Sequence, residues 1–406
     1  MQRSYSRVKW RRHLFFPMLM VIGALMVAQT RKYFFSSGWR WAYVLFLSTS
    51  ISFCLTPLCS RIAKNFDLID RPDSRKIHIE ATPLLGGVAV FIAFLMGIIA
   101  NGVYSLELGS ILAASALLFL VGIIDDFKGI PAWGRLLFQI ASTVMVVSCG
   151  IVLQVLPKSM GIFSQAGNIL LTLFWIIGIT NALNFFDGMD GLAAGLGVII
   201  SFFLGVVAFQ THQPFLGWIA VAMMGSCLGF LPYNFSLKGN ASIFLGDAGS
   251  TVIGFVLACI AVYGDWAEGS PVVALASPLL IFWVLVFDMV HITVDRIITG
   301  KVTNLRQWID YVGRDHLHHR LAVVLGGQRK SVLFIYLMSF CLGTSAVVLR
   351  YARPVDALLL LVQAIVLVVL ITILERRGRV IAANNDHVDA DMELVKERIK
   401  QVKSSG

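Results

Sequence analysis

The stretch LELGSILAASALLFLVGIIDDFKGI, residues 106–130, contains the pattern on which the fold depends. An apolar run with a single charged residue extends to Ile124, which is close to the roughly 20 residues that a helix needs to cross a bilayer. The run then stops at two adjacent carboxylates, Asp125 and Asp126. Ionisable side chains at membrane depth are costly and usually functional. The stretch therefore predicts a membrane-spanning helix with a pair of functional carboxylates at one end.

Comparable apolar runs recur up to about residue 374. Of the 406 residues, 57% are hydrophobic and 14% are charged, whereas soluble domains are roughly 45–50% apolar. We therefore predict an all-α polytopic membrane protein with about eleven core transmembrane helices. The predicted spans are residues 40–60, 84–101, 106–124, 135–156, 168–184, 190–209, 214–233, 248–264, 271–295, 331–350 and 355–374.

Three regions are expected along the chain: a basic segment at 1–39, the polytopic domain at 40–374 and a polar tail at 375–406. In the first region, several basic residues precede an apolar stretch from Leu14 to Ala28. No small-residue cleavage site follows it, which argues against a signal peptide. We predict an extra N-terminal span there, and an interfacial helix is the alternative. The tail is expected to be solvated and cytoplasmic.

The basic residues indicate which side of the membrane the connections face. Alternate connections, together with the tail, carry 22 Lys and Arg residues, whereas the other connections carry three. By the positive-inside rule, the first set is cytoplasmic. The net charge of +10 therefore reflects membrane topology, and we expect no nucleic-acid partner. The conspicuous Asp and His clusters all fall on the predicted cytoplasmic side.

Carboxylates recur in three of these cytoplasmic connections. One such group alone could mark the lipid–water boundary or a polar Asp-Gly turn, but several on the same face favour a site. Mutual repulsion would require a hard, oxygen-ligated cation, so we predict Mg²⁺ or Mn²⁺. The motif NALNFFDGMDGL spaces its polar residues by three, which predicts one helical face. FLGDAGS predicts a helix start whose backbone N–H groups cap the helix or receive an anion. The residues concerned are Asp125, Asp126, Asn181, Asn184, Asp187, Asp190 and Asp247.

Basic and imidazole groups lie in the same set of connections. They are Lys76 and His78 in RPDSRKIHIEATPLLGG, Arg135, and Arg314, His316, His318, His319 and Arg320 in RDHLHHRL. Histidines without cysteines and beside two arginines suit phosphate better than structural zinc. For the first stretch, a positive-inside signal is the alternative. The combination indicates phosphoryl transfer to a lipid acceptor, and the absence of a GxxxxGK[ST] loop argues against an ATPase.

Five stretches, in their order along the chain, resemble signatures of the polyprenyl-phosphate N-acetylhexosamine-1-phosphate transferases of glycosyltransferase family 4. They are RPDSRKIHIEATPLLGG (71–87), GIIDDFKGIPAWGRLLFQ (122–139), NALNFFDGMDGLAAG (181–195), FLGDAGS (244–250) and DHLHHRL (315–321). The resemblance implies a bacterial inner-membrane enzyme with its active site facing the cytoplasm. Such an enzyme moves a HexNAc 1-phosphate from a UDP-sugar to undecaprenyl phosphate, releases UMP and starts a cell-surface polysaccharide. The histidine motif looks like the branch that uses UDP-GlcNAc, and phospho-MurNAc-pentapeptide transfer is the alternative within the family.

The resemblance also implies roles for the motif residues. Asp247, Asp125 and Asp126 would engage the metal, and the Asp125–Asp126 pair would also engage the lipid phosphate. Asp187 and Asp190 would complete the catalytic cleft. Substrate would be held by Asn181, Asn184, His316, His318, His319, Arg314, Arg320, Arg135, Lys76 and His78. By analogy with relatives, a homodimer is expected.

A cation-coupled transporter is the alternative from another class, because polytopic proteins use intramembrane Asp and His as proton relays. Asp288, His291 and Asp295 share one predicted helical face and would be its best evidence. We find no internal repeat and few charges in the middle of spans, which argues against it. A lipid phosphatase or CDP-alcohol phosphotransferase would need a different Asp pattern.

Overall fold

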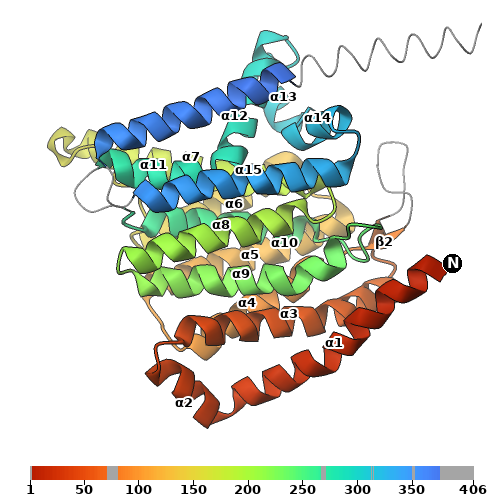
Figure 1. The fold of residues 1–406 in the computed structure, drawn as a ribbon. Coiled ribbons are helices and arrows are strands. Elements are labelled where there is room, and N and C mark those ends of the chain that lie inside the picture. The colour runs from red at the N-terminus through yellow and green to blue at the C-terminus, as the bar shows by residue number, and fades with distance from the viewer. Residues whose placement is uncertain are drawn as a thin grey trace, which may run out of the picture.

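The apolar runs of the sequence form helices in the computed structural model, which describes residues 2–70, 81–266, 271–311, 313, 315–349 and 353–374. Most of these helices lie side by side with roughly parallel axes (Figure 1). Their bounds are α1 Gln2–Met26, α2 Ala28–Ser36, α3 Arg40–Asn65, α4 Gly86–Asn101, α5 Leu106–Lys128, α6 Ala132–Ser148, α7 Ile162–Phe185, α8 Leu192–Gln210, α9 Pro214–Asn234, α10 Gly246–Tyr263, α11 Pro271–Ile281, α12 Trp283–Ile298, α13 Leu305–Asp310, α14 Leu317–Val324, α15 Gln328–Val348 and a last helix Pro354–Leu374. Two short 3₁₀ helices, η1 Lys158–Met160 and η2 Phe186–Gly188, interrupt the connections.

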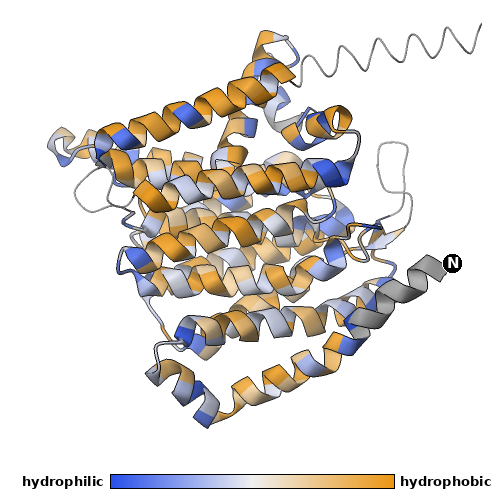
Figure 2. Ribbon diagram, viewed as in Figure 1, coloured by the Kyte–Doolittle hydropathy of each residue, from blue (hydrophilic) through white to orange (hydrophobic). Residues whose placement is uncertain are grey.

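The prediction of a polytopic membrane protein is confirmed. Within the described residues, eight helices are long and apolar enough to cross a membrane, and the number rises to ten if each of two bent helix pairs is one span. Figure 2 shows the expected distribution, with hydrophobic residues along the helices and hydrophilic residues concentrated at their ends.

Individual spans differ from the prediction in three ways. The expected spans 84–101 and 135–156 correspond to α4 and α6, which have only 16 and 17 residues. The expected span 271–295 is broken, because α11 and α12 meet at an angle of 83°. Pro278, one turn before this bend, lacks the N–H that an uninterrupted helix would use. The N-terminal apolar stretch is likewise divided between α1 and α2, which meet at 77°.

The all-α prediction needs one small correction. Strands β1 (Ile69–Asp70) and β2 (Thr82–Pro83) form a two-stranded antiparallel sheet. The second strand continues into backbone bonding with the segment before α10: Phe244 N–H donates to Pro83, and Gly87 N–H donates to Leu245. Two of the recognised motifs are thereby joined through their backbones. The polar tail 375–406 lies outside the described residues.

One end of the bundle collects the polar connections. The N-terminus, β2, α13 and α14 all lie at this end (Figure 1). We call it the motif end and define it by Asp125, Asp187, Asp247 and His316. The prediction that the Asp and His clusters share one side is consistent with this arrangement.

Helix α10 is the centre of the packing. In its apolar window 89% of the residues are buried, against 22% in the last helix. Neighbouring helices approach it closely where they carry glycine. A Cβ built on Gly122 of α5 would lie only 2.4 Å from the Ala248 Cα, and one on Gly87 of α4 only 2.4 Å from the Gly249 nitrogen. These contacts fix the position of the first turn of α10 along the axes of α4 and α5.

The close contact at Gly122 gives a first prediction. Gly122→Ala should destabilise the protein by about 1–3 kcal/mol, because the added methyl would meet backbone atoms that cannot move aside. Gly109→Ala, in the same helix, is the matched control, since nothing lies within 4 Å of its Cβ position. The control should be neutral or stabilising because alanine is the better helix former. Thermal unfolding of the detergent-solubilised variants measures the difference, and equal melting temperatures would contradict the prediction.

Candidate active site

Asp125 is held at the end of α5 by two interactions. Its Oδ1 accepts a 2.6 Å hydrogen bond from the Ile130 N–H, and its Oδ2 lies 3.2 Å from Arg135 Nη1. The chain turns there because Gly129 adopts a positive φ of 68°, which ends the helix. The Asp125 side chain is only 6% exposed. It therefore organises the turn and orients Arg135.

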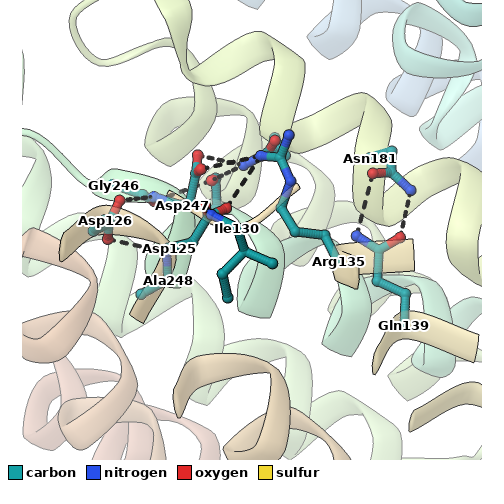
Figure 3. Close-up of polar contacts among 11 residues, drawn as sticks. Asp125, Asp126, Ile130, Arg135, Gln139, Asn181, Gly246, Asp247 and Ala248 are labelled. Atoms are coloured by element: carbon teal, nitrogen blue, oxygen red, sulfur yellow. Dashed lines mark hydrogen bonds and ion pairs between the residues drawn. The ribbon is translucent and has the colours of Figure 1, made fainter. Parts of the chain in front are cut away.

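Asp126 points toward α10 (Figure 3). Its two carboxylate oxygens accept hydrogen bonds from the backbone N–H groups of Asp247 at 2.9 Å and Ala248 at 3.4 Å. A carboxylate in this position accepts from backbone N–H groups that have no partner within the helix, and its negative charge is stabilised by the positive end of the helix dipole. Gly246, with φ of 79°, must be glycine, because its Cβ would also lie 2.7 Å from Asp126 Oδ2. The predicted helix start in FLGDAGS is confirmed, and the anion that it receives is Asp126.

The Asp247 carboxylate is partly accessible in this arrangement. Its Oδ1 accepts a 2.9 Å hydrogen bond from Asn184 Nδ2, and its Oδ2 lies 3.3 Å from Arg135 Nη1. The side chain is 37% exposed, compared with 6% for Asp125. Arg135 thus bridges two carboxylates from different helices (Figure 3). The structure brings together Asp125, Asp126, Asn184, Asp247 and Arg135, as the motifs predicted.

The prediction of one helical face for the NALNFFDGMDGL motif is only partly right. Asn184 belongs to α7, but Asp187 lies in η2, and Asp190 follows in a turn that precedes α8. Helix α7 ends at Phe185, and Gly191 has a φ of 81° that favours glycine, so the helical spacing is lost. Asp187 still lies close enough to the Gly246 backbone N–H and the Asp247 charge to interact with both. Asp190 instead accepts a 2.7 Å hydrogen bond from the Ala241 N–H.

Asn181 faces a neighbouring helix. Its amide exchanges two hydrogen bonds with Gln139 of α6, at 2.7 and 3.2 Å, and also donates to the Ile177 carbonyl (Figure 3). These bonds hold α6 against α7 beside the carboxylate cluster. The Asn181 amide therefore holds two helices together, and its contact with substrate stays a prediction.

The histidine motif begins helix α14 and packs against the Asp187 turn. The ring of His316 lies 4.9 Å from that of Phe185, and the ring of His318 lies 5.2 Å from that of Phe186. A Cβ on Gly188 would lie 3.1 Å from His318 Nε2, so the imidazole packs closely against the backbone there. His319 lies beside His318 with ring centroids 4.1 Å apart and the ring planes tilted by 44°. The carboxylate and histidine clusters therefore meet at residues 185–188.

His318 is fully buried, and neither of its ring nitrogens has a hydrogen-bond partner within the described part of the chain. Burial, assisted by the neighbouring His319, His316 and Arg320, lowers the pKa of His318 well below its usual value. The ring is therefore neutral at physiological pH. Two unsatisfied nitrogens in a buried ring are costly, which is typical of a group that awaits a ligand.

Two arginines near the motif end, Arg320 and Arg296, are paired with side chains that were not among the predicted site residues. Arg320 Nη1 donates to His291 of α12, and Arg296 of the same helix forms two 2.8 Å hydrogen bonds with the Asp315 carboxylate. Burial alone would raise the pKa of Asp315, but the hydrogen bonds and charge of Arg296 outweigh it and lower the pKa. Lys76, His78 and Arg314 lie outside the described residues.

Asp288 makes contacts with the histidine motif that nothing in the sequence indicates. It was expected only as part of a proton relay, together with His291 and Asp295. In the structure, its carboxylate contacts His316 Nδ1 at 2.8 Å and the Leu317 N–H at 2.7 Å. Since Asp288 and His291 are both engaged by α14, the face that suggested a transporter is occupied by the histidine motif. The only signal in the sequence that marks this residue is that Asp288 interrupts the apolar first half of α12.

The donor set fits a divalent ion that substrate helps to hold. Four carboxylates, Asp125, Asp126, Asp187 and Asp247, lie near the start of α10, and Arg135 bridges Asp125 and Asp247. Across the described ranges, no group of three His, Cys, Asp or Glu side chains is placed to hold a metal by itself. Mg²⁺ commonly takes one or two protein carboxylates and completes its shell with waters and substrate phosphates. Asp247, whose side chain is partly exposed and accepts from Asn184, suits that role.

Comparisons with known proteins agree with the motifs. Residues 108–265 match the family profile described as "Glycosyl transferase family 4". The chain is 32% identical over 319 residues to the Bacillus subtilis (strain 168) protein named "Probable undecaprenyl-phosphate N-acetylglucosaminyl 1-phosphate transferase", covering 77% of this chain and 85% of that relative. It is also 32% identical over 379 residues to the "Decaprenyl-phosphate N-acetylglucosaminephosphotransferase" of Mycobacterium tuberculosis, with 84% and 90% covered. Identity to the "Undecaprenyl-phosphate alpha-N-acetylglucosaminyl 1-phosphate transferase" of Escherichia coli (strain K12) is 29% over 315 residues, with 74% and 82% covered.

Proposed function

Because this chain belongs to glycosyl transferase family 4, we propose that it transfers GlcNAc 1-phosphate from UDP-GlcNAc to undecaprenyl phosphate. The observation that carries the proposal is the cluster of carboxylates at the start of α10, two of them bridged by Arg135, which adjoins the histidine motif at one end of an apolar bundle. At the end of membrane-spanning helices, such a site would be within reach of both a soluble nucleotide sugar and a lipid headgroup. The lipid-linked product would start a cell-surface polysaccharide.

The proposed reaction is a direct displacement at phosphorus. An oxygen of the undecaprenyl phosphate attacks the β-phosphorus of UDP-GlcNAc and forms a new P–O bond. The bond between the β-phosphorus and the bridging oxygen breaks, and UMP leaves with that oxygen. Positioning and electrostatic stabilisation supply most of the catalysis in transfers of this kind. Asp125 or Asp126 would hold or remove the acceptor proton, and Asp187 and Asp190 would complete the cleft.

Phosphate oxygens would be held by the groups at the histidine motif. His316, His318 and His319 lie against the Asp187 turn, so a diphosphate beside Asp247 would also be within reach of their ring nitrogens. Asn184 and Arg135 orient Asp247 from two sides. We assign Arg314, Arg320, Lys76, His78 and Asn181 to substrate binding from the family motifs alone.

Mg²⁺, or Mn²⁺ in its place, would be held by Asp247 with help from the Asp125–Asp126 pair, and it would offset negative charge on the diphosphate. Asp247 is suited to this because its carboxylate is partly exposed while Asn184 fixes its orientation. The other carboxylates add negative potential that favours a cation over an anion before substrate arrives.

The proposal includes a membrane arrangement. The motif end faces the cytoplasm of a bacterial inner membrane, as the basic connections predict. Helices α4 and α6 and the bent pair α11–α12 count as spans, which gives the eleven predicted core spans, and α1 with α2 adds an N-terminal one. Short helices can cross where the bilayer thins around them. A homodimer is proposed by analogy with relatives.

The activity assay tests the proposal directly. Purified protein with UDP-GlcNAc, undecaprenyl phosphate and Mg²⁺ should release UMP and form a lipid-linked sugar in a one-to-one ratio. Chelation with EDTA should abolish both products, and added Mg²⁺ should restore them. Parallel reactions with other UDP-HexNAc donors and with UDP-MurNAc-pentapeptide identify the donor. If no donor yields UMP and a labelled lipid, the transferase assignment fails.

A two-step route through an aspartyl-phosphate is the rival mechanism. Incubating the enzyme with labelled UDP-GlcNAc and no lipid acceptor separates the two routes. The direct route predicts no covalent sugar-phosphate adduct and no UMP release. A labelled, acid-stable adduct on an aspartate would overturn direct displacement.

A further inference from the structure

Asp288 is a carboxylate inside the apolar part of the protein, on helix α12, and its side chain is completely buried. Burying a charge is expensive unless the charge is paired and hydrogen-bonded. The partners of Asp288 all come from one element. Its Oδ2 accepts from His316 Nδ1 at 2.8 Å, its Oδ1 accepts from the Leu317 N–H at 2.7 Å, and Arg320 Nη2 lies 3.8 Å away. The pairing therefore ties the first turn of α14 to α12.

The two hydrogen bonds have different consequences. The bond from the Leu317 N–H satisfies a donor at the first turn of α14, where His316 provides no side-chain cap of its own. The bond from His316 Nδ1 fixes the orientation of the imidazole ring, since a carboxylate can only accept. The opposite nitrogen, Nε2, then points away from Asp288. It has no hydrogen-bond partner among the described residues.

We propose that Asp288 is a positioning residue that sets the ring of His316, and with it the start of α14, for the diphosphate of the nucleotide sugar. This inference rests on the proposed transferase function. In the same way, carboxylates that hold metal-binding or catalytic histidines fix the tautomer and ring orientation of the imidazole. The Phe185 ring packs against His316 at 4.9 Å and restricts the ring from the side of the Asp187 turn. Asp288 thus acts on the donor through His316 without touching it.

The bend between α11 and α12 accounts for the position of Asp288. The bend of 83° changes the direction of the chain at Phe282, and Asp288 follows within the second turn of α12. His291, one turn further along, contacts Arg320 of α14 at 3.0 Å. Helix α12 therefore contacts α14 at two successive turns. The Asp288 pair orients the histidine, whereas the His291 pair only adds to the docking of α14.

Steady-state kinetics of Asp288→Asn test the proposal. The amide keeps an acceptor for Leu317 but presents N–H groups toward His316, so the ring should lose its orientation. We expect the KM for UDP-GlcNAc to rise roughly tenfold or more, the usual size of outer-shell effects on histidines. The KM for undecaprenyl phosphate should change less than about twofold. Asp295→Asn, on the same helix, is the matched control and should leave both KM values unchanged.

A double-mutant cycle with His316→Ala identifies the route of the effect. If Asp288 acts through His316, the double variant should be no worse than His316→Ala alone. If the effects of the two substitutions multiply in the double variant, or if both KM values change equally, the positioning role is wrong. Hydrogen–deuterium exchange supplies a readout that does not depend on activity. Asp288→Ala should speed exchange in residues 315–325 severalfold, and unchanged exchange would also overturn the proposal. Absence of transfer by the wild-type protein would instead reject the proposed function.

Discussion

Asp247→Asn is expected to lower the rate of GlcNAc 1-phosphate transfer by at least about a thousandfold, which is the range for loss of a charge that stabilises a transition state. The substitution removes the charge of a carboxylate that is 37% exposed and lies 3.3 Å from Arg135. It keeps the carbonyl oxygen that accepts from Asn184, so the start of α10 should remain intact. The initial rate of UMP release, measured at saturating Mg²⁺, gives the effect.

Asp265→Asn is the matched control for this substitution. Asp265 follows the other end of α10 and is exposed, and the bonds recorded for it involve its backbone and Gln213. The control should retain full activity. Both variants should unfold at the temperature of the wild-type protein. If Asp247→Asn keeps more than a tenth of the activity, Asp247 does not hold the metal.

The helices, and the residues that gather near the start of α10, could be predicted because both follow from short stretches of sequence. Apolar runs of about 20 residues have few alternatives to helices in a bilayer. The motifs FLGDAGS and NALNFFDGMDGL also place Asp247 and Asn184 correctly beside one another. This success depends on helix ends, because a carboxylate that closes an apolar run must lie near the membrane surface, where other helices also end.

The connections between the motifs could not be predicted, because they depend on tertiary packing. Asp126 and Ala248 are separated by 122 positions in sequence, and only the close packing of Gly122 against Ala248 brings the carboxylate to the start of α10. Asp288 was assigned to a relay since no local signal indicates that it accepts from His316, 28 residues later. The end of α7 agrees with the predicted span 168–184, but the single helical face predicted for the motif was only partly right, for a related reason. Helical spacing continues through the motif, while Gly188 and Gly191 permit a different backbone.

The contact between Asp126 and α10 leads to the second large effect. Asp126→Ala should lower activity by at least about a hundredfold and should also destabilise the protein, because two backbone N–H groups of α10 would lose their acceptor. Loss of a helix cap costs about 1–2 kcal/mol. The activity falls because the freed N-terminus no longer fixes the backbone of Asp247, and because a carboxylate proposed to share in holding the metal or the acceptor proton is lost. Thermal unfolding and UMP release, measured on the same preparation, give both quantities.

Asp126→Asn separates this positioning role from direct participation in the reaction. An asparagine side chain keeps one acceptor for the Asp247 N–H but lacks the charge. If Asp126 acts mainly by holding α10, the asparagine variant should recover most of the lost stability and a substantial part of the activity relative to Asp126→Ala. If Asp126 holds the acceptor proton or the metal, the asparagine variant should be as stable as the wild-type protein yet as inactive as the alanine variant. Each Asp126 oxygen accepts one hydrogen bond from α10 and keeps a second lone pair. Because the proposed function gives Asp126 a share in holding the metal or the acceptor proton, we expect the second result.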